Sequence, residues 1–397
     1  MRRFRRTALA PLTALAVTGT LGLAACSEPA DDPGPGSGRG IDARSYFADY
    51  ESPEQEDAFV SSQPHPAPGS AADSGSDRPY LPRPTEGNTF VDAGTSGHVD
   101  PRDDPRSTFA LDVDTGSYGV ARSLLAQGLR PPPESIRVEE WVNAMTYDDP
   151  APTDADLGVT AESALAPGRE DGTQLVRVAV RARDVDPAER PRVNVTLVVD
   201  RSGSMDIRDR LGLVQSSLAL LADRLDGDDT VSVVSFEDEA RPILEPTPVH
   251  ETDTILGAIE ELTPGGSTNL EAGLRLGYEQ ARAAFDPDAV NVVVLASDGV
   301  ANVGDTGPGS ITETIAEEGR DGIHLVTVGY GMGNYNDHLM EQLADLGDGF
   351  YSYVDTFDEA ERLFGTELVT TLTPVAAEAR AQVTFDPELV RSYRLVG

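Results

Sequence analysis

The chain has 397 residues and a formal net charge of −37, with 31 Lys and Arg residues against 68 Asp and Glu residues. A hydrophobic fraction of 39% is enough for a globular core, and the length allows two domains plus unstructured sequence. Such an acidic surface repels phosphate groups, which argues against nucleic-acid binding, and a single cysteine excludes an intramolecular disulfide.

The first 26 residues predict a secretory signal. Arginines fill four of the first six positions, an apolar stretch follows from Ala8 to Leu23, and small residues precede Cys26. A cysteine directly after the cleavage point resembles a bacterial lipobox, in which it is acylated and becomes the first mature residue. We therefore expect residues 1–25 to be removed and lipid on Cys26 to anchor the protein to the extracytoplasmic side of the cell membrane. The alternative is an ordinary signal peptide with a chance cysteine.

Two regions of different character follow the signal. Residues 26–105 are dense in Pro, Gly, Ser and Asp, as in Asp31–Gly38, and lack apolar periodicity, so we expect a disordered acidic tether. Residues 106–191 predict a small α+β module. Its expected strands lie at 108–114, 158–165 and 174–185, and its expected helices at 118–129 and 136–145.

From residue 192 to residue 370, short apolar runs alternate with helical patterns. This alternation predicts an α/β fold with a doubly wound, mostly parallel sheet and helices on both faces. The run at 243–249 contains two prolines and is expected at an edge of the sheet. The other expected strands are 193–199, 230–236, 291–296, 324–328 and 351–354, and the expected helices include 211–225, 254–262, 270–285, 337–346 and 358–368.

The last segment, residues 371–397, is expected to begin a further β region. The runs 381–385 and 393–396 have strand character. Two strands without partners would be poorly stable, so we expect either that the sequence is a fragment or that this region is cut short.

Oxygen-bearing side chains follow three segments of the predicted sheet. Asp200, Ser202 and Ser204 come directly after the first buried strand, Thr268 lies in a glycine-rich loop before a helix, and Asp298 follows the strand at 291–296. Ligands of parallel sheets bind at the carboxyl ends of the strands, where these loops meet. Hard oxygen donors with few carboxylates suit Mg²⁺, which retains some of its water.

This set of residues resembles the metal-ion-dependent adhesion site of von Willebrand factor type A domains. The resemblance covers residues 193–368 and implies that Ser202, Ser204 and Thr268 bind the ion directly, while Asp200 and Asp298 act through water. It also implies an open metal position, which an Asp or Glu of a partner protein completes. Mg²⁺ is the expected ion, with Mn²⁺ or Ca²⁺ as alternatives.

The resemblance extends before this domain. The segments 107–118 and 138–143 are similar to the N-terminal region of a family of bacterial lipoproteins that carry a von Willebrand factor type A domain. The expected function is therefore metal-dependent protein binding at the cell surface, as an adhesin or within an envelope complex, and not catalysis.

Other interpretations remain open at this stage. Ser, Thr and Asp at these junctions could serve only as turns and helix caps. A metal-stabilised scaffold without exchangeable ligand is a second possibility. The paired sequences Asp114-Thr115-Gly116 and Asp305-Thr306-Gly307 are found in aspartic proteases, although those enzymes need an all-β framework. The serine-hydrolase elbow, the H-E-x-x-H zinc motif and the lysine of a phosphate-binding loop are absent from the sequence.

Overall fold

A computed structural model was used for the three-dimensional description. The residues that the structure describes are 39–52, 87–92, 94–111, 113–184, 190–299, 311–333, 335–368 and 379–396. Within these ranges, no helix is both long enough and apolar enough to cross a membrane. Cys26 lies outside them.

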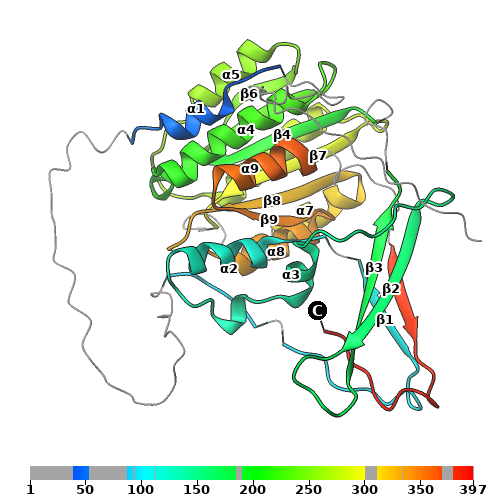
Figure 1. The fold of residues 1–397 in the computed structure, drawn as a ribbon. Helices are drawn as coiled ribbons and strands as arrows, with labels where there is room; N and C mark the ends of the chain where they lie inside the picture. The colour runs from blue at the N-terminus through cyan, green and yellow to red at the C-terminus, as the bar shows by residue number, and fades with distance from the viewer. Residues whose placement is uncertain are drawn as a thin grey trace, which may run out of the picture. The chain divides into compact units, whose positions relative to one another are not determined.

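A six-stranded sheet forms the centre of the fold (Figure 1). In spatial order its strands are β6 (Ala240–Pro248), β5 (Thr230–Phe236), β4 (Val193–Asp200), β7 (Val290–Ser297), β8 (Ile323–Tyr330) and β9 (Tyr351–Val354). All neighbouring pairs are parallel except β5 and β6, so β6 is the antiparallel edge strand. The predicted mostly parallel sheet and its proline-containing edge strand are confirmed.

Helices cover both faces of this sheet, as the alternation predicted. One face carries α4 (Leu213–Arg224), α5 (Thr252–Glu260) and α9 (Phe357–Arg362), and the other carries α6 (Leu270–Ala283), α7 (Ile311–Arg320) and α8 (Asp337–Leu346). Successive strand residues point to opposite faces. Leu197 and Val199 therefore enter the core under α4, whereas Val198 enters the core under α6.

Part of the segment expected to be a tether is ordered, which corrects the prediction. Residues 43–48 form α1 (Ala43–Ala48), which packs against α4. Phe47 and Tyr50 lie against the core, and the Phe47 ring lies 6.4 Å from that of Phe357 on α9. The apolar side chains of this short helix gain their burial from a helix about 170 residues later, so local composition did not reveal it.

Residues 106–191 form helices and strands, but they are not a separate core. Helix α2 (Gly116–Ala126) packs on β9, and its Val120 and Leu124 are buried in the core under α6 and α8. Helix α3 (Val138–Asn143) follows. Strands β2 (Leu157–Leu165) and β3 (Gln174–Ala182) pair as an antiparallel hairpin, as the sequence predicted.

The strand expected near the C-terminus has a partner, contrary to the prediction. Strand β10 (Arg380–Thr384) pairs antiparallel with β1 (Arg106–Ala110), with Phe109 opposite Ala381. Tyr393 forms an isolated antiparallel bridge with Val99. The segment before α2 and the C-terminal segment therefore supply strands to each other, a pairing over about 270 residues that no local pattern encodes.

Candidate metal site

The loop after β4 and the threonine loop are joined through their backbones. The Gly203 amide donates to the Gly266 carbonyl at 3.1 Å, and the Gly265 amide donates to the Arg201 carbonyl at 2.8 Å. Gly266 has φ +70°, and a Cβ at this position would lie 2.8 Å from the Glu237 carboxylate. Glycine is therefore required here for both backbone conformation and space.

Sheet register brings the third loop beside the first. Strands β4 and β7 are neighbours with Val199 opposite Ala296, so Asp200 lies next to Ser297 at the carboxyl edge. The Ser297 hydroxyl donates to Asp200 Oδ2 at 2.6 Å, and the Ser202 amide donates to Asp200 Oδ1 at 2.9 Å. The Asp200 carboxylate is thus fixed in orientation, as a ligand-positioning group must be.

Hydroxyl groups complete the arrangement. Ser202 Oγ and Ser204 Oγ lie 3.1 Å apart. Thr268 is 1% exposed, and its Oγ1 has no hydrogen-bond partner among the described residues. A buried hydroxyl without a partner costs about 1–3 kcal/mol. Since Asn269 caps α6 by accepting from the Ala272 amide, the helix end holds Thr268 in this position.

The two aspartates are both fully buried, with relative exposure of 0%. Burial, and next the negative charge of Asp298, raises the pKa of Asp200 to about 7. Arg210 donates to Asp298 Oδ2 at 2.8 Å and so supplies one positive charge. A second cation beside Asp200 would relieve the remaining repulsion.

This donor set fits a small divalent ion. It offers hydroxyl and carboxylate oxygens, which Mg²⁺ prefers, together with an orphaned threonine hydroxyl. Across the described ranges, no group of three or more His, Cys, Asp or Glu side chains is arranged so that it could hold a metal ion, so zinc-like ligation has no candidate there. The structure brings the three predicted loops to one edge; metal ligation by Asp200, Ser202, Ser204, Thr268 and Asp298 stays a prediction.

Two residues of this site were missed from the sequence. Ser297 is not among the predicted ligands, although its hydroxyl orients Asp200. Arg210 lies ten residues after Asp200, and its approach to Asp298 depends on the fold. Alternation along β7 could have placed Ser297 near Asp200, whereas no sequence signal pointed to Arg210.

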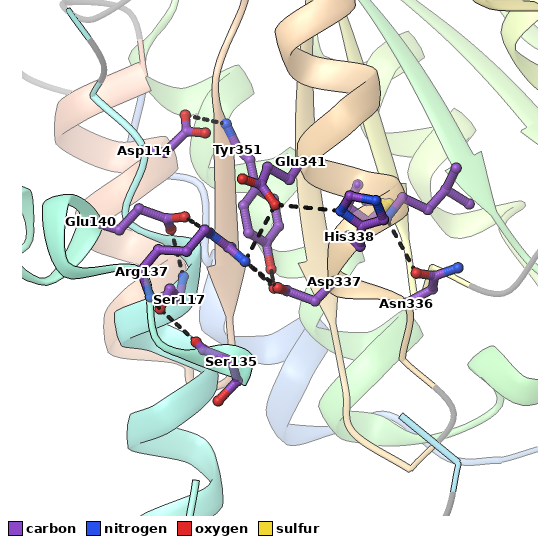
Figure 2. Close-up of polar contacts among 12 residues, drawn as sticks. Asp114, Ser117, Ser135, Arg137, Glu140, Asn336, Asp337, His338, Glu341 and Tyr351 are labelled. Carbon is purple, nitrogen blue, oxygen red and sulfur yellow. Dashed lines mark hydrogen bonds and ion pairs between the residues drawn. The ribbon is translucent and has the colours of Figure 1, made fainter. Parts of the chain in front are cut away.

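A second buried polar cluster joins α3 to α8 (Figure 2). Arg137, only 5% exposed, precedes α3, bonds to Glu140 on that helix and donates to Asp337 Oδ2 at 2.5 Å. Glu341 lies 3.3 Å from the same guanidinium, and the Tyr351 hydroxyl donates to Asp337 at 2.6 Å. One guanidinium faces three carboxylates, so the cluster cannot keep all of them ionised at low cost.

This imbalance predicts a pH dependence of stability. Burial, opposed by Arg137 but reinforced by Asp337, Asp345 and Glu139, raises the pKa of Glu341 to about 7. Between the ordinary glutamate pKa and pH 7, the folded chain holds a proton that the unfolded chain has lost, so stability falls as pH rises through this window. The free energy of unfolding of the wild type should therefore fall between pH 5 and pH 8. In Glu341→Gln this fall should be smaller by about 1–3 kcal/mol, as measured by urea unfolding.

The control for that measurement is Glu313→Gln, because Glu313 is exposed on α7. It should leave the pH dependence of the wild type unchanged. Equal pH slopes in the wild type and the Glu341→Gln variant would show that Glu341 is not the titrating group.

The aspartate of the first D-T-G sequence has a structural contact. Asp114 Oδ1 accepts from the Tyr351 amide at 2.8 Å, and Thr115 precedes α2 as its N-cap residue. The second sequence, beginning at Asp305, lies outside the described residues. The framework around Asp114 is a helix beside a parallel strand, which differs from the all-β setting of a protease dyad.

Comparison with known proteins adds to this description. Residues 194–366 match the family described as von Willebrand factor type A domain, and residues 84–177 match the one described as von Willebrand factor. An uncharacterized protein of Escherichia coli (strain K12), YfbK, is 40% identical over 301 residues, which is 74% of this chain and 52% of that protein. The chain thus spans about half the length of this relative.

Two further similarities are weaker. Inter-alpha-trypsin inhibitor heavy chain H2 of Mesocricetus auratus is 28% identical over 193 residues, covering 46% of this chain and 20% of that protein. A solved structure of a von Willebrand factor type A protein from Catenulispora acidiphila has 19% identity and a TM-score of 0.40, covering 55% of this chain and 50% of that one. The two family matches show that the chain carries a von Willebrand factor type A domain, with an additional region before that domain.

Proposed function

We propose that the chain is a surface-anchored protein that binds a partner protein through a divalent metal ion. The observation that carries the proposal is the buried Thr268 hydroxyl, which has no hydrogen-bond partner among the described residues. Thr268 lies two residues after Gly266, whose carbonyl accepts a hydrogen bond from the Gly203 amide in the loop after β4. The match to the von Willebrand factor type A family supports protein interaction as the general role.

The five residues would bind the ion in two ways. Ser202, Ser204 and Thr268 would bind it directly, and Asp200 and Asp298 would bind it through water. Mg²⁺, or Mn²⁺ or Ca²⁺ in its place, supplies an electrophilic position that can accept a carboxylate oxygen. Neutral inner ligands leave most of the ion's charge for that oxygen, so an Asp or Glu of the partner is the group that fits.

The anchor is the second part of the proposal. Four arginines, an apolar stretch and Cys26 support lipid attachment on the extracytoplasmic side of the cell membrane. The chain's net charge of −37 disfavours nucleic acid as the partner.

A surface pull-down tests this function. Wild-type protein with Mg²⁺ is expected to retain a partner that is lost with EDTA and lost in Asp298→Ala. Asp288 is an exposed acid two residues before β7 begins, at the opposite end of this strand from Asp298, so Asp288→Ala should behave as the wild type. Recovery of the same partner with EDTA and in Asp298→Ala would reject the metal bridge and favour a scaffold role.

A further inference from the structure

A buried arginine lies inside the proposed metal site. Arg210 is 7% exposed, and its Nη1 donates to Asp298 Oδ2 at 2.8 Å and to the Ser204 carbonyl at 2.6 Å. Its Nη2 donates to the Met332 carbonyl at 2.8 Å. One guanidinium therefore joins the loop after β4, the loop after β7 and the loop after β8.

The surroundings hold this side chain in place. Arg210 belongs to a π-helical turn, Arg208–Gly212, which directly precedes α4, and such turns are frequent at functional sites. Gly331 has φ +70°, and a Cβ there would lie 2.3 Å from Arg210 Nε. The glycine leaves the space that the guanidinium needs, so Arg210 has little freedom to move away from Asp298.

The positive charge of Arg210 affects how tightly the site can bind a divalent ion. Asp200 and Asp298 together carry two negative charges when ionised, and Arg210 offsets one of them. A divalent ion must therefore bind beside a fixed positive charge, which weakens its binding in a water-poor site. The loaded site then carries a net charge of about +1 instead of zero by this count, which favours an anionic ligand.

We propose that Arg210 sets the affinity of the site: its guanidinium partly replaces the ion at Asp298, weakens metal binding and leaves the loaded site positive for a partner carboxylate. This inference rests on the proposed metal site. It makes Arg210 a positioning residue for Asp298 and an electrostatic competitor of the ion.

Titration with Mg²⁺ alone tests the proposal, using isothermal calorimetry on the full chain. We expect Arg210→Gln to bind Mg²⁺ at least about tenfold more tightly than the wild type, since the opposing charge is gone. If Arg210 only held the loops in place, its loss would weaken Mg²⁺ binding. Tighter Mg²⁺ binding therefore indicates that Arg210 competes with the ion electrostatically. Arg210→Lys keeps the charge and should stay within about threefold of the wild type.

Arg208→Gln is the matched control. Arg208 lies on the same π-helical turn as Arg210, but its side chain is 55% exposed and pairs with the neighbouring Asp209. Because solvent screens this exposed charge, the change should leave Mg²⁺ affinity unchanged. If Arg210→Gln does not fold, Arg210→Met fills a similar volume without charge and takes its place.

The outcomes are distinguishable. Wild-type binding with unchanged or weaker binding in Arg210→Gln and Arg210→Met would overturn the role of Arg210 and leave the metal site standing. An Arg210→Lys variant that binds as tightly as the neutral variants would also overturn it. No binding in any variant, the wild type included, would overturn the metal site and this inference together.

Discussion

Replacing Arg137 by methionine is expected to lower the free energy of unfolding by about 3–5 kcal/mol, because removal of one partner leaves buried carboxylates without a counter-ion. Glu140 and Asp337 are 1% and 0% exposed, and both bond to this guanidinium. The loss is large compared with the total stability of an ordinary domain. Urea unfolding followed by circular dichroism measures it.

An exposed ion pair provides the control. Arg102 pairs with Asp100 at 2.5 Å, but the Arg102 side chain is 75% exposed, so Arg102→Met should leave the free energy of unfolding close to that of the wild type. A variant that combines Arg137→Met with Glu140→Gln and Asp337→Asn should recover part of the lost stability, because the stranded charges are removed. An Arg137→Met variant no less stable than Arg102→Met would contradict the proposed role of the buried cluster.

This cluster connects the region before the type A domain to the domain itself. Arg137 precedes α3, whereas Asp337 begins α8 and Tyr351 begins β9. Figure 2 shows these side chains pointing toward one another across the gap between their elements. With Val120 and Leu124 of α2 in the same core, the preceding region completes one side of the domain.

The sequence was most informative where local pattern and topology agree. Strand β5 has the predicted bounds, Thr230–Phe236, because β-branched and aromatic residues fill most of it and acidic residues flank both ends. Asp200 and Asp298 could be assigned to one edge because Asp200 ends β4 and Asp298 follows β7, two strands of a parallel sheet. Such inferences need only the order of elements and the direction of the strands.

It was least informative where contacts join distant segments. Helix α1 packs on α4, and Phe47 and the nearby Tyr50 lie against the core, yet this segment has a tether-like composition. The pairing of β1 with β10 and the approach of Arg210 to Asp298 likewise depend on the finished fold. Residue propensities and motif spacing describe neighbours along the chain, so they cannot predict which distant segments come into contact.

Thr268 gives the largest expected effect on metal binding. Its Oγ1 is buried and has no partner among the described residues, so a bound ion would satisfy it at no cost to another hydrogen bond. Thr268→Ala removes this ligand, and Asp200→Ala removes the carboxylate that the Ser297 hydroxyl orients. We expect each change to abolish stabilisation by Mg²⁺.

The melting temperature of the protein with and without Mg²⁺ therefore tests the metal site most directly. At a Mg²⁺ concentration 100 times the dissociation constant, binding should stabilise the wild type by about 2.7 kcal/mol and raise its melting temperature by several degrees. Ser267→Ala, a half-buried neighbour in the same loop, should keep that shift, while Thr268→Ala should lose it. A wild type whose melting temperature does not respond to Mg²⁺, Mn²⁺ or Ca²⁺ would contradict the metal site.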